Sequence, residues 1–233
     1  MASAERDALV ALFRSTHGDS WHDKRNWATD ADLSTWSGVE VDKDGRVTEL
    51  YLISDNVRGC IPGALGALTN LTVLYFGSDK LTGPIPDALG ALTNLVKLDF
   101  RNNQLTGSIP EALGTLTNLL WLNLCENQLT GRIPEVLGAL TKLTMLGLGP
   151  NHLTGPIPEA LGALTNLTKL YLDENKLSGP IPAKLGALVN LESLRLNDNQ
   201  LTGPIPEELG ALTKIKRLHV EGNQLTGTVP LSV

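Results

Sequence analysis

The sequence lacks most features that mark membrane-spanning or nucleic-acid-binding proteins. Its 233 residues include 19% charged and 4% aromatic residues. No apolar run approaches about 18 residues, the length that a membrane-spanning helix needs. The formal net charge is -6 with both signs mixed along the chain, whereas a nucleic-acid surface needs clustered Lys and Arg. We therefore expect no membrane span and no nucleic-acid partner.

The motifs of common catalytic and metal sites are also missing. The sequence contains no GxxxxGK[ST] phosphate loop, no HExxH and no CxxC. Its four histidines are His17, His22, His152 and His219, which lie far apart along the chain. No nucleophile, base or ligand set stands out, so we predict a protein that is not an enzyme, with no catalytic residues, no metal and no cofactor.

Cysteine is scarce, and this bears on location. Cys60 and Cys125 lie in different repeats, and a stacking distance of about 4.8 Å per coil puts them on the order of 15 Å apart, too far for a disulfide. The first residues, MASAERDALVALF, carry charges where a signal peptide has its apolar stretch. Two free thiols suit a reducing compartment, so we expect a cytoplasmic protein.

What the sequence does contain is a 24-residue period. Copies begin at Val47, Leu71, Leu95, Leu119, Leu143, Leu167, Leu191 and Ile215. Each follows LxxLxLxxNxLTGxIPxxLGxLTN, and the eighth copy is truncated. A fixed period of this length is typical of stacked-coil proteins, in which each coil contacts only its neighbours. We predict an N-terminal cap over residues 1–46 and a repeat array over residues 47–233.

The positions within one copy predict its local structure. Apolar positions 4 and 6 alternate with variable ones, which indicates a short strand, and stacked copies then form a parallel sheet. Gly at position 13 and Pro at position 16 favour an extended flank, followed by a short 3-10 turn. Position 9 is Asn from Asn103 onward, an amide that can both donate to and accept from the turning backbone, whereas Asp55 and Asp79 replace it in the first two copies.

Residues 1–46 differ from the repeats. Leu9, Leu12 and Phe13 fall on one face of a predicted helix that ends near Gly18. Three of the four tryptophans follow, and we expect them to cover the first coil: Trp21, Trp27 and Trp36. The dipeptide Asp44-Gly45, flanked by valines, predicts a short hairpin into the first coil.

The repeat resembles the plant-type leucine-rich repeat, whose LTGxIPxxLG signature recurs from residue 47 onward. The stretches Arg6-Asp7-Ala8-Leu9 and Trp36-Ser37-Gly38-Val39 are similar to the cap of that family. Ser34 and Val41 stand where the secreted plant form has two cysteines, so the resemblance implies a disulfide-free cap, as in repeats attached to Roco-type GTPases. It also implies an α/β solenoid: a right-handed superhelix with a parallel concave sheet, short flanking strands and 3-10 turns.

The concave face carries the candidate binding site. Strand positions 3, 5, 7 and 8 point away from the buried leucines, and their residues vary between copies while the leucines do not. Aromatic residues there, bordered by charge, have the composition of a protein-binding hot spot. The predicted ligand-binding residues, all taken as exposed, are Tyr51, Tyr75, Asp99, Arg101, Trp121, Met145, Tyr171 and Arg195.

We therefore predict a non-catalytic module that binds a protein or peptide, in signalling or immune-type recognition as the resemblance implies. Two alternatives stay open: the sensor domain of a larger Roco-type GTPase or receptor kinase, and a structural or self-associating array. The truncated eighth copy lacks a polar end cap, so the C-terminal coil is a further candidate surface for association.

Overall fold

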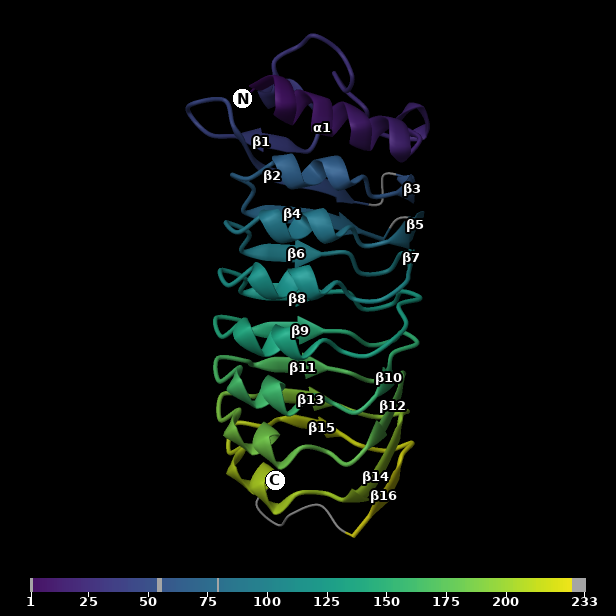
Figure 1. Ribbon diagram of the computed structural model, residues 1–233, viewed down its shortest axis with the longest axis vertical. Coiled ribbons are helices and arrows are strands. Elements are labelled where there is room, and N and C mark those ends of the chain that lie inside the picture. The colour runs from purple at the N-terminus through teal and green to yellow at the C-terminus, as the bar shows by residue number, and fades with distance from the viewer. Residues whose placement is uncertain (1, 54–55, 79, 228–233) are drawn as a thin grey trace.

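The computed structural model describes residues 2–53, 56–78 and 80–227. The chain forms one elongated stack of coils, with the cap at one end and the last repeats at the other (Figure 1). The order along the stack follows the order in the sequence, as the colour gradient shows. This is the predicted solenoid, in which residues close in space lie one copy apart.

A long sheet runs down one side of the stack. In the described ranges it has nine strands, and neighbouring repeat strands are parallel with a 24-residue offset, as in Leu98 opposite Leu122. Only the first pair is antiparallel, which confirms the predicted hairpin around Gly45. The strands, in spatial order, are β1 (Val39–Val41), β2 (Val47–Ile53), β4 (Val73–Gly77), β6 (Lys97–Asp99), β8 (Trp121–Asn123), β9 (Met145–Gly147), β11 (Lys169–Tyr171), β13 (Ser193–Arg195) and β15 (Arg217–His219).

Shorter strands form two flanking sheets, as the Gly and Pro positions of the repeat predict. The first contains β3 (Arg58–Cys60), β5 (Lys80–Pro84) and β7 (Gln104–Thr106). The second contains β10 (Thr154–Gly155), β12 (Lys176–Gly179), β14 (Gln200–Pro204) and β16 (Gln224–Thr226). Between the two sheets, a single bridge joins Ser108 to Thr130.

Each of the first seven repeats returns to the long sheet through a short 3-10 helix that begins after the Pro of the IP pair, because this Pro adopts an extended backbone before the turn. These helices are Gly63–Ala67, Asp87–Ala91, Glu111–Thr115, Glu135–Ala139, Glu159–Ala163, Ala183–Ala187 and Glu207–Ala211. Leucines from the helices and strands fill one continuous core between them, and most are fully buried. The predicted 3-10 turns are thus confirmed.

The asparagine column satisfies backbone groups where the chain leaves the sheet. Asn103 Nδ2 donates to the carbonyl oxygens of Phe76 and Phe100, while its Oδ1 accepts from Leu81 N at 3.0 Å. The same pattern repeats one copy later at Asn127. Such bonds remove the cost of buried, unpaired peptide groups. The predicted imperfection of the column at Asp55 and Asp79 concerns positions outside the described residues.

The cap consists of α1 (Ala2–Ser15) and a tryptophan cluster. Trp21, Trp27 and Trp36 are each at most 4% exposed, which confirms their predicted role in the cap core. Their rings are in contact, with centroids 4.8 Å apart for the first two and 5.1 Å for the last two. Two further 3-10 helices, Gly18–Ser20 and Leu33–Thr35, shape the segment that carries these rings. Glu5 joins the cap to the first coil by accepting a hydrogen bond from Val47 N at 3.1 Å.

At the other end, the core is less covered. Ile215, Leu218, Val220 and Leu225 are only partly buried, whereas the equivalent positions of inner coils are fully buried. Residues 228–233, on which part of the prediction of an open end rests, lie outside the described residues. Association through this coil stays a prediction. In the part of the chain that is described, no helix combines the length and apolar character needed to cross a bilayer.

Candidate binding site on the open sheet face

The long sheet has one face against the core and one free of it. We call the second the open sheet face, defined by the side chains at positions 3, 5 and 7 of each copy. Strand alternation puts them there: in β6, Leu98 is fully buried in the core, and its neighbours Lys97 and Asp99 project to the other side. The eight predicted site residues all lie on this face, but they do not form one exposed surface.

The first part of the face, over β2, β4 and β6, is closed by contacts among its own side chains. The Tyr51 and Tyr75 rings lie 6.3 Å apart, and Lys97 Nζ lies 4.8 Å from the centre of the Tyr75 ring. Arg101 Nη2 donates to the Tyr75 hydroxyl. Tyr75 is therefore only 8% exposed, so the prediction that it is a free contact residue was wrong. Its neighbours in adjacent copies cover it.

Tyr51 is half-buried and also paired. Its hydroxyl donates to Glu49 Oε2 at 2.6 Å, and this bond, with burial and the nearby negative charge, raises the pKa of Tyr51 to about 12. The phenol is thus held neutral and has a partner within its own strand. Tyr51 keeps part of its surface exposed, as predicted, but its hydrogen-bonding capacity is largely used.

Asp99 is the second correction. Its side chain is 1% exposed, against the prediction of an accessible carboxylate. Trp121 Nε1 donates to Asp99 Oδ2 at 3.3 Å, Arg101 N donates to Oδ1 at 3.2 Å, and Arg101 Nε lies 3.8 Å from Oδ1. Asp99 therefore holds the half-buried Trp121 and the exposed Arg101 in place and is not a free contact.

The second part of the face contains a hollow. A cavity of about 280 Å³ opens between β8 and β11. It opens where the intervening copy has Gly147 and Gly149 at positions 5 and 7; all other copies carry a side chain at position 5, and at position 7 all but the copy with Gly77 do. Five of the eight predicted residues line it: Arg101, Trp121, Met145, Tyr171 and Arg195. We call this cavity the glycine hollow.

Met145 lines the glycine hollow but is only 3% exposed, so the prediction of an exposed methionine was wrong. Its flexible chain occupies the space that Gly147 leaves: a Cβ atom at position 147 would lie 2.7 Å from Met145 Cε. The same atom would lie 2.7 Å from Cys125 Sγ and 2.8 Å from Asn123 Oδ1. These three side chains form the floor of the cavity.

Asp173 is a site residue that the sequence analysis left out. It lines the glycine hollow and is 8% exposed. Burial, partly offset by the charges of Arg195 and His219, raises the pKa of its carboxyl group above the usual value. Within the described residues, no other residue donates a hydrogen bond to this carboxyl. The two glycines of the preceding copy were the available signal, because they open the space beside it.

Cys125 lines the same cavity and is half-buried. Burial, with the negative charge of Asp173 as a smaller cause, raises the pKa of the Cys125 thiol to about 12. The thiol is therefore neutral at physiological pH and contributes as a small apolar wall.

Cations line the rim and lie over the rings. Lys169 Nζ lies 5.8 Å and Lys97 Nζ 5.6 Å from the centre of the Trp121 ring. Arg195 Cζ lies 4.6 Å from the centre of the Tyr171 ring. None of these three cations takes part in an ion pair with a carboxylate in the described parts of the chain. Cation–π contacts hold them without neutralising them.

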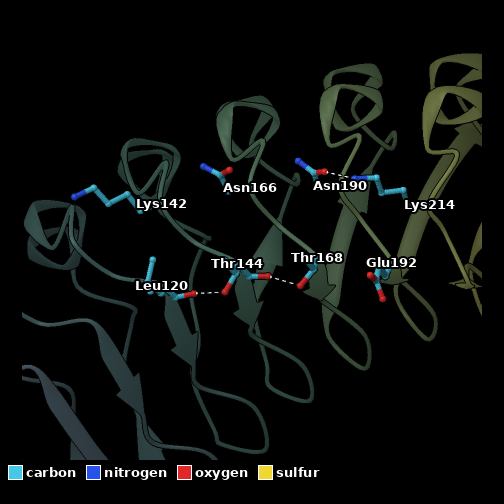
Figure 2. A pocket seen from close by; sticks show the side chains of 8 residues that line it. All are labelled: Leu120, Lys142, Thr144, Asn166, Thr168, Asn190, Glu192 and Lys214. Atoms are coloured by element: carbon cyan, nitrogen blue, oxygen red, sulfur yellow. Dashed lines mark hydrogen bonds between the residues drawn. The ribbon is translucent and has the colours of Figure 1, made fainter.

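A second cavity, of about 440 Å³, lies along one edge of the sheet (Figure 2). It runs between two columns of polar residues, one near the 3-10 helices and one at the start of the strands. Thr144 and Thr168 donate to carbonyl oxygens one copy back, and Lys214 Nζ donates to Asn190 Oδ1 at 2.7 Å. Its polar groups thus largely bond to adjacent copies, which is a structural role.

Neither cavity offers a metal site. Across residues 2–53, 56–78 and 80–227, no group of three or more His, Cys, Asp or Glu side chains is placed to hold a metal ion. What the glycine hollow offers is an aromatic wall on two sides, a buried acceptor and a cationic rim. These groups can bind a side chain of another molecule.

The chain can now be compared with known proteins. Residues 98–229 match a family model described as a leucine-rich repeat region. No significant match is found among curated protein sequences. Solved structures do match, and the similarity extends over nearly the whole chain.

The ectodomain of the Arabidopsis thaliana receptor kinase GASSHO1/SCHENGEN3, solved with Casparian strip integrity factor 2, is 37% identical with a TM-score of 0.84. The Arabidopsis receptor kinase HAESA, solved with the peptide hormone IDA and the co-receptor SERK1, is 30% identical with a TM-score of 0.73. A plant ice-binding protein is 26% identical with a TM-score of 0.75. Each alignment covers 98% of this chain, but only 31%, 43% and 89% of the respective relatives.

The chain thus spans about a third of the length of the first of these ectodomains and less than half of the second. The shared features are those already described: parallel strands, flanking strands and 3-10 helices stacked on a fixed period. The chain belongs to the leucine-rich repeat family and resembles the ectodomains of plant peptide-hormone receptors.

Proposed function

We propose that this chain binds a protein or peptide on its open sheet face, through the glycine hollow and its cationic rim, and that it does so without catalysis. The observation that supports this most is the combination of Trp121 and Tyr171 around an open cavity with three cations that form no ion pair with a carboxylate among the described residues. Half-buried aromatic residues beside a cavity are typical of interface hot spots.

The charge of the face supports an acidic ligand. The chain as a whole has a formal net charge of -6, yet Lys97, Lys169 and Arg195 lie together on this face. A local surplus of one sign steers and orients a ligand of the opposite sign. The relatives support the class of partner, since two of their structures contain a peptide hormone or factor.

A peptide-display selection tests this proposal. The folded chain is the bait, and recovered peptides are measured against three variants. Trp121→Ala and Tyr171→Ala should each weaken binding at least about tenfold, the usual effect of a hot-spot aromatic residue. Glu111→Ala, which changes an exposed residue at the start of a 3-10 helix, is the matched control and should leave binding unchanged. Peptides that bind all variants equally would place the site elsewhere and contradict the proposal.

A second candidate function is ice binding, which one relative has and which a column of hydroxyls favours. Position 12 is Thr or Ser in seven successive copies, and these residues are exposed or half-exposed along the flanking strands: Thr82, Thr106, Thr130, Thr154, Ser178, Thr202 and Thr226. Regularly spaced hydroxyls can each donate to and accept from ordered water. Thermal hysteresis that disappears in a Thr130→Lys, Thr154→Lys double variant would support this candidate; absence of hysteresis in the parent chain would exclude it.

The larger protein to which this chain contributes and its cellular location are also matters of proposal. A role as the recognition part of a larger Roco-type GTPase or receptor kinase, in signalling or immune-type recognition, is a proposal that a longer reading frame would test. A cytoplasmic location likewise stays a proposal, supported by the two free thiols at Cys60 and Cys125. Fractionation of the native protein would decide it.

A further inference from the structure

We propose that the glycine hollow is an anchor subsite for a tyrosine side chain that lies within an acidic segment of the bound peptide. This inference rests on the proposed function and names the chemistry of its ligand. The ring would lie between Trp121 and Tyr171, its hydroxyl would donate to Asp173, and the acidic neighbours would meet the cationic rim. The ring position, the hydrogen bond and the charge contact each rest on a separate observation.

The shape of the hollow selects a planar group. Trp121 on β8 and Tyr171 on β11 stand on either side of β9, where Gly147 has no side chain of its own and Met145 and Cys125 form the floor of the cavity. The cavity volume of about 280 Å³ accommodates one large side chain. Aromatic rings prefer the faces and edges of other rings at such distances, and Met145 adds a sulfur contact at the floor.

The buried acceptor selects a hydrogen-bond donor. Asp173 is more than nine-tenths buried, lines the cavity and accepts no hydrogen bond from another residue in the described ranges. The donor beside it is its own backbone N–H, and a buried carboxyl with spare acceptor capacity destabilises the free protein. A phenol hydroxyl that enters the hollow would supply a further donor, whereas a phenylalanine or leucine would bury Asp173 more deeply without adding one.

The rim argues against a cationic anchor. Arg101, Lys169 and Arg195 line the opening and outnumber the carboxylates Glu126 and Asp173 there, so a lysine or arginine side chain would enter a region with a surplus of positive charge. A neutral donor avoids this repulsion. In the part of the chain that the structure describes, these cations form one ion pair with a carboxylate, the 3.8 Å contact of Arg101 with Asp99, so acidic residues on either side of the anchor would pair with the others.

Three pentapeptides, blocked at both ends, test the inference directly. They are Asp-Glu-Tyr-Glu-Asp, the same peptide with Phe in place of Tyr, and Lys-Lys-Tyr-Lys-Lys. Titration into the folded chain, followed by NMR through the indole N–H of Trp121, gives their relative affinities. We expect the acidic tyrosine peptide to bind about tenfold more tightly than the phenylalanine peptide, because a hydrogen bond to a buried carboxylate is lost, and the basic peptide to bind more weakly than both.

Variants assign the effect to the hollow. Asp173→Ala should reduce the preference for tyrosine over phenylalanine to about one, and Gly147→Ala should weaken both acidic peptides by filling the floor. The Cβ of the second variant meets only side-chain atoms, so the backbone need not move. Glu221→Ala is the matched control, because it removes an exposed carboxylate from the same position 7 two copies further along. Circular dichroism confirms that each variant is folded.

The outcomes separate this inference from the proposed function. Equal affinity for the tyrosine and phenylalanine peptides, or a preference that survives Asp173→Ala, would overturn the subsite while leaving binding on the open sheet face intact. Failure of all three peptides to bind at millimolar concentration would also overturn it. Display peptides that bind independently of Trp121 and Tyr171 would instead contradict the proposed function itself.

Discussion

The two parts of the open sheet face contain the same kinds of residue but differ in how those residues are used. Over β2, β4 and β6, Tyr75 and Asp99 are buried and bonded to Arg101 and Trp121. Over β8 to β13, Tyr171 is half-buried, no other described residue donates a hydrogen bond to the Asp173 carboxyl, and both side chains line the glycine hollow. The side chains of the first part pack against and bond to one another, whereas those of the second part line a cavity.

The difference shows that neither the position in the repeat nor the residue type decides whether a side chain is exposed to a ligand. Neighbours one copy away, about 4.8 Å distant, determine it. Tyr75 has Lys97 beside it and Arg101 bonded to its hydroxyl, whereas beside Tyr171 the preceding copy offers only Gly147 at the same position. Predictions that compare matched residues from the two parts can therefore break or sharpen this distinction.

The largest effect is expected for the two tyrosines at position 5. Tyr75→Ala removes a buried ring and leaves Arg101 without its hydroxyl partner, so we expect a loss of about 3 kcal/mol in the free energy of unfolding. Tyr171→Ala removes a half-buried ring with no hydrogen-bonded hydroxyl partner in the described residues and should cost about 1 kcal/mol. Urea denaturation monitored by circular dichroism measures both.

For peptide affinity we expect the opposite order, with the larger loss in Tyr171→Ala and the smaller loss in Tyr75→Ala. Tyr171→Ala removes a wall of the glycine hollow, while Tyr75→Ala removes no residue that lines it. Equal losses of stability for the two variants, or loss of binding in Tyr75→Ala alone, would show that the two parts of the face are not distinct in the way described.

The second comparison concerns the two buried aspartates. Asp99→Ala leaves the Trp121 indole N–H without its acceptor, and we expect it to destabilise the fold by about 1–3 kcal/mol. Asp173→Ala removes a buried carboxyl that no other described residue bonds, and we expect it to stabilise the fold by about 1 kcal/mol. Opposite signs from the same substitution are the test.

The effect of Asp173 should depend on pH. Its pKa is raised in the folded chain relative to the usual 3.8, mainly by burial, so the folded state binds the proton more tightly than the unfolded state. The parent chain then loses stability as pH rises from 3.8 through the folded pKa, and keeps that deficit at neutral pH. The advantage of Asp173→Ala should accordingly be smallest below pH 3.8. An advantage that grows on acidification would contradict the assigned burial effect.

Much of the fold could be predicted because each feature repeats. Every copy needs to bury its leucines, pair its turning backbone and form the same turn. The leucines, the Asn103 to Asn223 column and the Gly and Pro positions all favour one structure, a stack of identical coils. The cap could be predicted from the composition of its segment, because three tryptophans beside the first coil need to be buried. The family model and the structural relatives agree with the predicted leucine-rich repeat fold.

The candidate site was predicted less well for the opposite reason. Its residues vary, so their environment depends on which side chains meet across copies, and this requires the register and rotamers of neighbours. Reading each column alone identified Trp121 and Tyr171 but placed Tyr75, Asp99 and Met145 at the surface and omitted Asp173. Gly147 and Gly149 were the decisive residues, because the side chains that they lack create the cavity.

The smallest expected effect is a difference in alkylation rate between the two cysteines. This difference tests how accessible the glycine hollow is to solvent. The thiolate is the reactive form, and with a pKa of about 12 only ~10⁻⁴ of the Cys125 thiol is ionised at pH 8. Cys60, exposed on a flanking strand, should therefore be alkylated by iodoacetamide first, and Cys125 should react mainly after unfolding. Peptide mass mapping after a timed reaction resolves the two sites. If Cys125 reacts as fast as Cys60, the floor of the hollow must admit water and reagent freely, and Asp173 beside it could not be a desolvated carboxyl that waits for a ligand donor.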